Sequence, residues 1–232
     1  GSEMCIRDRS TYYGPTFICD LGEISDEMLP YSKRAFESYL EGEDYKEIVA
    51  SEIWYEERKD FSAKAIGTNR IAHKEERGFE LLQGSEIFQG RLLGGCLESL
   101  YDILTTTRYQ DEKAVCEKYG LFPSIEEWKD KILFIETCEE KPAPELFEKE
   151  ISLLKEKGVF DVVNGVLVGK PQDETYYQEY AEILVRVIDN RQLPIVYNVN
   201  FGHATPRCAL QYGVMAEVDM KQKKIVLIHP IA

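Results

Sequence analysis

The chain has 232 residues, a length that fits one large or two small domains. Hydrophobic residues make up 44% and charged residues 30% of it, a composition typical of a globular protein that buries a core. The formal net charge is -14, and only Lys221, Lys223 and Lys224 form a local basic group. Binding to DNA, RNA or anionic lipid needs a basic surface, so the composition excludes a nucleic-acid or membrane-surface partner.

No apolar run reaches the roughly 18 to 20 residues that span a bilayer, and no charged-then-apolar leader opens the sequence. We therefore expect a cytoplasmic protein and, in that compartment, reduced cysteines rather than disulfides. The cysteines and histidines are widely separated and have no ligand spacing, so neither a metal nor a cofactor is predicted. These residues are Cys5, Cys19, Cys96, Cys116, Cys138, Cys208, His73, His203 and His229.

The first part of the chain is predicted to contain a foreign remnant and a linker. Residues 1–10 form a charged, patternless stretch that we interpret as a cloning remnant or foreign join and exclude from the fold. A strand-like segment follows from Thr11 with no earlier element to pair with, so we expect that the chain is truncated at its front. Residues 11–60 are predicted to be a helical inter-domain linker, with helices at Pro30–Leu40, stopped by Gly42, and at Asp44–Arg58.

The rest of the chain, residues 61–232, is predicted to be an α/β domain. Frequent glycines over residues 61–95 indicate short twisted strands and tight turns. Beyond them, short apolar runs alternate with helical patterns, which is typical of a parallel sheet with crossover helices, and a hairpin follows at the C-terminus. The predicted elements are strand Lys131–Glu136, helix Pro144–Lys157, strand Val162–Gly169, helix Asp173–Asn190 with Asp173 as its N-cap, strand Pro194–Val199, and hairpin strands Val214–Val218 and Ile225–Ile228.

Two residues lie where a parallel sheet places its chemistry, beyond the carboxyl ends of the strands. Glu136 ends one predicted strand, and His203 lies in the loop that leaves another. A histidine held in one tautomer by a carboxylate can accept a proton from a serine or cysteine nucleophile. The alternative is structural: a histidine bonded to its own loop and a glutamate in water.

Several motifs, in order, resemble the C-terminal domain of the LD-carboxypeptidases and the related microcin C immunity peptidases. The main ones are Ile132-Leu-Phe-Ile-Glu136, Pro194-Ile-Val-Tyr-Asn-Val-Asn-Phe-Gly-His203 and Ala209-Leu-Gln-Tyr-Gly213. Gln89-Gly-Arg-Leu-Leu-Gly-Gly95 resembles the entry segment of that domain, and Tyr12-Tyr-Gly-Pro15 resembles the start of its linker. The resemblance covers nearly all of the chain after residue 10 and implies a swivelling β/β/α-type domain with a short parallel sheet, crossover helices and a C-terminal hairpin.

The resemblance implies a serine peptidase with a Ser-Glu-His triad, in which Glu136 is the acid and His203 the base. In that family the serine sits in a G-Y-S-D elbow of a preceding domain, a motif that these 232 residues do not contain. We therefore expect the chain to be inactive without that N-terminal domain, which is its predicted partner. A peptide or peptidyl-nucleotide substrate and a homodimer are also expected.

Cys96 and Trp54 are the candidate substrate-binding residues. Cys96 stands where the family's Gly-Gly motif is usually followed by Asn, and Trp54 resembles a linker aromatic that stacks on substrate in some relatives. Two alternatives stay open at this point. The chain could be a binding module that has kept the fold without the chemistry, or a thiol hydrolase that uses Cys96 or Cys208.

Overall fold

A central sheet organises the protein in the computed structural model, which describes residues 11–41 and 45–228. Its strands are β2 (Tyr45–Val49), β5 (Glu80–Gln83), β6 (Ile87–Cys96), β7 (Lys131–Glu136), β8 (Gly165–Gly169), β9 (Ile195–Val199), β11 (Met215–Asp219) and β12 (Lys224–Ile228). The order is β2-β12-β11-β6-β7-β8-β9-β5. Strands β6 to β9 run parallel, and antiparallel strands extend both edges. This arrangement confirms the predicted α/β class and the C-terminal hairpin.

Strand β7 shows how a short apolar run is buried on both faces of the sheet. Leu133 and Ile135 belong to one core cluster, whereas Ile132 and Phe134 belong to the other. Successive side chains of a strand point to opposite faces, so a strand covered on both sides must be apolar throughout. The predicted bounds of this strand agree with the observed ones.

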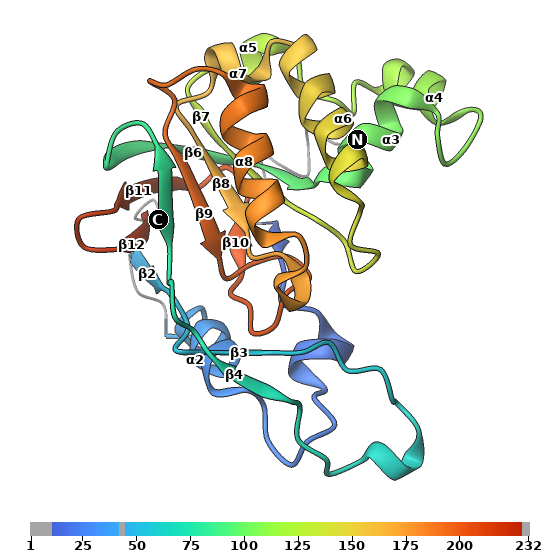
Figure 1. Cartoon of the computed structure of the whole chain (residues 1–232), viewed down its shortest axis with the longest axis vertical. Coiled ribbons are helices and arrows are strands. Elements are labelled where there is room, and N and C mark those ends of the chain that lie inside the picture. Colours follow the sequence, from blue (N-terminus) through green and yellow to red (C-terminus); the bar gives the residue numbers. More distant parts are fainter. Residues whose placement is uncertain (1–10, 42–44, 229–232) are drawn as a thin grey trace.

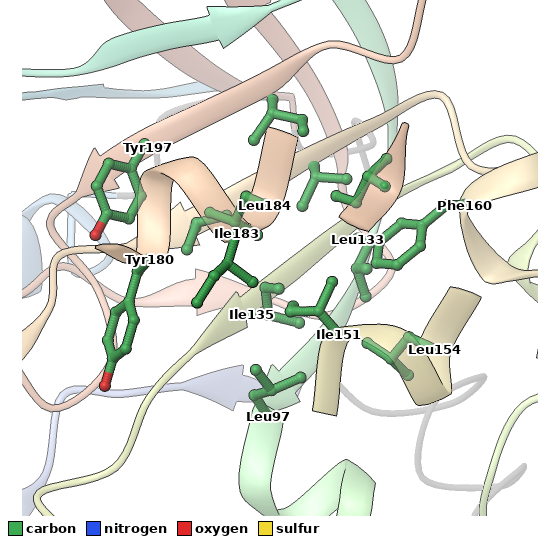
Figure 2. Packing of buried hydrophobic residues seen from close by; sticks show 14 of the residues in the cluster. Leu97, Leu133, Ile135, Ile151, Leu154, Phe160, Tyr180, Ile183, Leu184 and Tyr197 are labelled. Atoms are coloured by element: carbon green, nitrogen blue, oxygen red, sulfur yellow. The ribbon is translucent and has the colours of Figure 1, made fainter. Parts of the chain in front are cut away.

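Two crossover helices, α6 (Pro144–Glu156) and α8 (Tyr177–Ile188), cover one face of the sheet. Figure 2 shows Ile151 of α6 and Leu184 of α8 converging on the β7 side chains. On the other face, side chains of the sheet itself, including those of β11 and β12, form a second core cluster together with β10 (Leu210–Gln211) and α2 (Pro30–Ser38). The sheet therefore forms the middle layer of the domain.

The residues predicted to start and end the two crossover helices are confirmed for α6 but not for the start of α8. Helix α6 starts with Pro144, and Gly158, in the left-handed region at φ 76°, follows its end as predicted. Asp173 is not the N-cap of α8, and that prediction was wrong. It lies in η3 (Gln172–Glu174) with φ 55°, and its carboxylate accepts from Lys141 and from the backbone N–H of Glu57. Long-range partners satisfy this side chain, so it is not available to cap the helix.

Small helices fill the connections of the α/β domain. Between β6 and β7 the chain forms a protruding helical excursion, visible to the right of the sheet in Figure 1. The excursion contains α3 (Leu97–Thr105), α4 (Glu112–Tyr119) and α5 (Ile125–Trp128), whereas α7 (Val159–Val162) lies between α6 and β8.

The predicted helix at Asp44–Arg58 was wrong. Residues 45–49 form strand β2, which pairs with β12 at the edge of the sheet, and Ile53–Tyr55 forms β3, which pairs with β4 (Ala72–Lys74). The helix predicted from Pro30 is confirmed as α2, and Gly42 and Asp44 lie outside the described residues. The region also contains β1 (Tyr12–Tyr13), η1 (Phe17–Leu21) and η2 (Ala63–Ala65).

Apart from strand β2, most of residues 11–75 gather at one end of the sheet. In Figure 1 they lie below the sheet, on the side to which the β8 and β9 arrows point. Two contacts tie them there: β1 pairs with β10, and the backbone N–H of Tyr55 donates to the carbonyl of Thr205 at 2.9 Å. The segment from the first part of the chain therefore flanks the loops that leave the parallel strands.

The described cysteines are free thiols, namely Cys19, Cys96, Cys116, Cys138 and Cys208. Among the helices of residues 11–41 and 45–228, none combines the length and hydropathy needed to cross a bilayer.

Candidate active site

Glu136 and His203 meet at the carboxyl edge of the parallel sheet. Glu136 is the last residue of β7, and His203 lies four residues after the end of β9. His203 Nδ1 is 2.9 Å from Glu136 Oε2 and 3.1 Å from Oε1, and the backbone N–H of His203 donates to Oε2 at 3.0 Å. The contact expected from their positions in the sequence is present.

Two glycines make room for this approach. Gly202 has φ 91°, and a Cβ built there would lie 2.5 Å from Oε2 of Glu136. A Cβ on Gly169, at the end of β8, would lie 2.7 Å from Cβ of Glu136. Any other residue at 202 would be strained by its backbone conformation and would also displace the carboxylate. The loop backbone therefore wraps the acid at van der Waals distance.

Tyr13 provides a further donor to the acid. Its hydroxyl donates to Oε1 of Glu136, whose residue is only 1% exposed. The Tyr13 ring packs on Phe134 and Tyr212, with centroids 5.5 and 6.3 Å away. Burial, followed by the Glu136 charge, raises the pKa of Tyr13 far above its usual value, so the phenol keeps its proton and acts as a donor.

The surroundings favour the protonated form of His203. The hydrogen bond to Glu136 is the largest cause that raises its pKa, and the charges of Glu136 and Glu139 act in the same direction. Burial and the charge of Arg207 oppose them. Nε2, the second ring nitrogen, lies 3.0 Å from Oε2 of Glu139, whose side chain is 58% exposed. The imidazole is thus placed between a buried and a solvent-facing carboxylate.

Arg207 fastens the loop that carries His203. Its guanidinium donates to the carbonyl of His203 at 2.9 Å and to the Thr205 hydroxyl at 3.1 Å, and its Nε pairs with Asp20 at 3.1 Å. Asp20 belongs to η1, so the ion pair joins the first part of the chain to the loop. This buried pair limits movement of the His203 backbone.

His203 opens onto a hollow of about 470 Å³, which we call the His203 hollow. It lies between the end of β6, the start of α3 and the loop after β7. Its lining carries four carboxylates and one guanidinium, so the wall is predominantly acidic. The lining residues are Cys96, Glu98, Ser99, Asp102, Thr107, Arg108, Cys138, Glu139, Glu140 and His203.

Cys96 lies beside the acid, opposite Glu136 in the β6–β7 register. Its thiol donates to Oε2 of Glu98 at 3.1 Å. Burial, together with the charges of Glu98 and Glu136, raises the thiol pKa well above its usual value. Cys208 is buried, and burial raises its pKa to about 12. Nucleophilic cysteines need the thiolate, so these surroundings argue against a thiol hydrolase.

Trp54 lies outside the lining of the His203 hollow, on β3. Its ring stacks on His73 with centroids 4.2 Å apart, and Lys170 Nζ lies 5.1 Å from the centre of the indole. The next residue, Tyr55, pairs with Thr205 of the His203 loop. Trp54 is therefore on the same edge of the sheet as the acid and the histidine.

Sequence reasoning missed three residues of this site: Tyr13, Glu139 and Arg207. Glu139 could have been found, because it follows Glu136 by three residues at the same strand end. Arg207 follows His203 by four residues in the same loop, so its position was also visible in the sequence, whereas Tyr13 left no local signal because only the fold brings it to Glu136. Within residues 11–41 and 45–228, no group of three or more His, Cys, Asp or Glu side chains could hold a metal ion.

A family model described as "LD-carboxypeptidase C-terminal domain" matches residues 89–218, more than half of the chain. The chain belongs to this family. The match begins in β6 and ends in β11, so it contains β7, β9 and the loop of His203. The resemblance drawn from the sequence motifs is confirmed.

Solved structures and curated proteins are also similar to this chain. An MccF-like protein from Streptococcus pneumoniae, solved with AMP, superimposes with a TM-score of 0.92 at 49% identity over 96% of this chain and 64% of its own. An MccF-like protein from Bacillus anthracis gives 0.73 at 25% identity, over 96% of this chain and 61% of its own. The microcin C7 self-immunity protein MccF of Escherichia coli is 26% identical over 224 residues, 93% of this chain and 58% of MccF. The chain spans 58% to 64% of the lengths of these relatives, and 48% of the length of a putative carboxypeptidase of Treponema pallidum.

Proposed function

We propose that this chain supplies the acid and the base of a Ser-Glu-His serine peptidase, Glu136 and His203. The observation that carries the proposal is the bond between His203 Nδ1 and the buried Glu136 carboxylate at 2.9 Å. A neutral imidazole that donates from Nδ1 has its lone pair on Nε2, where a nucleophile can be deprotonated. Family membership and the position of both residues within the matched segment support this assignment.

In the proposed reaction, Nε2 of His203 accepts the serine proton as the hydroxyl attacks the amide carbon. The imidazolium that forms is stabilised by the Glu136 carboxylate and then returns the proton to the leaving group. Oε2 of Glu139 lies 3.0 Å from Nε2 of His203, so the exposed Glu139 side chain has to move away before the serine hydroxyl can reach Nε2. The raised pKa of His203 favours the step in which it takes up the proton.

The nucleophile is proposed to come from an N-terminal domain with the family's G-Y-S-D elbow, on the same polypeptide or a separate one. These 232 residues contain no such motif. Ser99 lines the His203 hollow but contacts the Cys96 sulfur and has no elbow setting. We therefore expect residues 1–232 alone not to hydrolyse peptides.

The proposed substrate is an amide next to a terminal residue, with an aminoacyl- or peptidyl-nucleotide as the first choice and a murein peptide as the second. The S. pneumoniae relative was solved with AMP, and MccF with glutamyl sulfamoyl guanosine and with aspartyl sulfamoyl adenosine. Trp54 and Cys96 are proposed to contact the substrate. The first lies on the edge that carries His203, and the second lines the His203 hollow.

We also propose that the chain self-associates as a homodimer. Large apolar side chains are exposed in the first part of the chain, with Phe17, Ile18 and Ile66 at 79%, 73% and 70%. Phe17 and Ile18 are neighbours in the chain and both are exposed, and adjoining exposed apolar side chains are typical of an interaction site. Light scattering coupled to size exclusion tests this, and a mass that stays monomeric at high concentration would contradict it.

The test of the peptidase proposal is reconstitution. The chain is incubated with aspartyl sulfamoyl adenosine or a labelled muropeptide, alone and with a separately expressed N-terminal domain of the S. pneumoniae relative. We expect cleavage only in the mixture and none when the chain carries His203→Ala. Turnover by the chain alone that iodoacetamide abolishes would favour the thiol mechanism, and binding without cleavage in the mixture would favour the non-catalytic module.

A further inference from the structure

The carboxylate of Glu136 is held by donors on both of its oxygens. Oε2 accepts the backbone N–H of His203 at 3.0 Å and faces Nδ1 at 2.9 Å. Oε1 accepts the hydroxyl of Tyr13 and lies 3.1 Å from Nδ1. At 1% exposure the residue is closed off from bulk water. The rotation of this carboxylate is therefore set by His203 on one side and by Tyr13 on the other.

Tyr13 is itself rigidly placed. It belongs to β1, where it pairs with Leu210 of β10, and its ring is packed between Phe134 and Tyr212. Phe134 precedes the acid by two residues on β7, so the ring that carries the hydroxyl rests on the strand that carries Glu136. Because the Tyr13 ring is already fixed by packing, its hydroxyl can restrain the Glu136 carboxylate at little further cost in side-chain entropy.

We propose that Tyr13 is a positioning residue that holds the Glu136 carboxylate in the orientation in which it bonds Nδ1 of His203. This rests on the proposed function, in which Glu136 orients the catalytic base. Tyr13 lies 123 residues before Glu136, in the segment that the sequence predicted to be a linker. The linker segment thereby takes part in the geometry of the acid and the base.

A packing role and a positioning role can be separated, because Tyr13→Phe keeps the ring and removes only the O–H donor. In the packing case, Tyr13→Phe leaves the imidazole unchanged. In the positioning case, the carboxylate loses the donor that fixes its rotation, so its bond to Nδ1 weakens and the pKa of His203 falls. Groups that also face this pair are Glu139, Arg207, Cys96 and Tyr212, and none of them is altered by the substitution.

The experiment measures the His203 pKa by NMR in the 232-residue chain, for wild type, Tyr13→Phe and the matched control Tyr12→Phe. Tyr12 is the neighbouring tyrosine of β1, and its ring packs on Tyr39 instead. We expect the His203 pKa to fall by about 0.5 unit in Tyr13→Phe and to stay at the wild-type value in Tyr12→Phe. An unchanged or raised pKa in Tyr13→Phe, with thermal unfolding like that of the control, would overturn the proposal.

A second measurement uses the reconstituted enzyme. Tyr13→Phe should lower kcat roughly tenfold and leave KM within about twofold, because orientation of the base matters in the transition state. Equal kcat values for wild type and Tyr13→Phe would count against Tyr13. If the wild-type mixture cleaves nothing, the peptidase proposal fails by itself, while the shift of the His203 pKa still decides whether Tyr13 positions Glu136.

Discussion

Replacing Glu136 by Gln removes the negative charge next to His203 and keeps the shape of the side chain. The carboxylate accepts from the backbone N–H of His203, from its Nδ1 and from the Tyr13 hydroxyl. A hydrogen bond to a charged group contributes about 1.5 to 3 kcal/mol. The Gln carbonyl can still accept from His203 and the Tyr13 hydroxyl can turn round, so we expect a net loss of about 2 kcal/mol in unfolding free energy where His203 is charged.

The pKa of His203 determines how the stabilisation by the Glu136–His203 pair depends on pH. Glu136 is the main cause that raises the folded-state pKa of His203 above its ordinary value of 6.5. The stabilisation from this pair is therefore fully present below 6.5 and is lost as the pH rises through the folded-state pKa. We expect Glu136→Gln to lower Tm by about 6 °C near about pH 5.5, and by less near about pH 8.5.

Differential scanning calorimetry at the two pH values measures this, with Glu140→Gln as the control because Glu140 is an exposed carboxylate of the same hollow. The Tm of Glu140→Gln should stay close to that of the wild type at both pH values. NMR should show a lower His203 pKa in Glu136→Gln, and kcat of the reconstituted enzyme should fall by about 10³ to 10⁴. A Tm difference that does not depend on pH would refute the coupling of the two residues.

Three further substitutions or treatments test the surroundings of the pair. Gly202→Ala should lower the free energy of unfolding in urea by about 2 to 4 kcal/mol, because the added Cβ would press on Glu136. The control Gly213→Ala, also at positive φ but with nothing within 4 Å of its Cβ, should lower it clearly less. Equal losses in the two variants would contradict the clash. Glu139→Gln should lower the His203 pKa by less than Glu136→Gln does, since Glu139 is exposed and acts by charge alone. A larger shift for Glu139→Gln in an NMR titration would contradict the greater influence of Glu136. Cys96 should react with iodoacetamide much more slowly than glutathione near about pH 7.5, by mass spectrometry, and rapid alkylation would revive the thiol mechanism.

Local patterns predicted the elements that are buried from both sides. Strand β7 is a continuous apolar run between its end residues, β9 is apolar except for Asn198, and α6 has a proline at its start and a glycine beyond its end. In such segments burial and local preference agree, so the pattern is sufficient. The positions of Glu136 and His203 at one edge followed from the parallel topology.

Strand β2 was not predicted because a lysine stands at one of its buried positions and interrupts the alternation of apolar and polar side chains. Ile48 is buried and Glu47 and Val49 are exposed, as expected of an edge strand, but the other buried position described is Lys46, at 5% exposure. Its Nζ lies 5.9 Å from the centre of the Tyr39 ring on the segment that follows α2. A lysine at an inward position hides the period of two, and only pairing with β12 makes the segment a strand.

The amino-acid order alone determined the α/β class, the main strands and helices of the C-terminal part, and the two residues proposed as acid and base, because each of these depends on burial patterns within short segments. Tertiary structure decided what surrounds that pair. Tyr13 reaches Glu136 across 123 residues, Glu139 reaches Nε2 of His203, and Asp20 reaches Arg207. Hydrogen bonds between distant residues depend on ångström-scale placement by packing of the whole domain, and no local pattern encodes that placement.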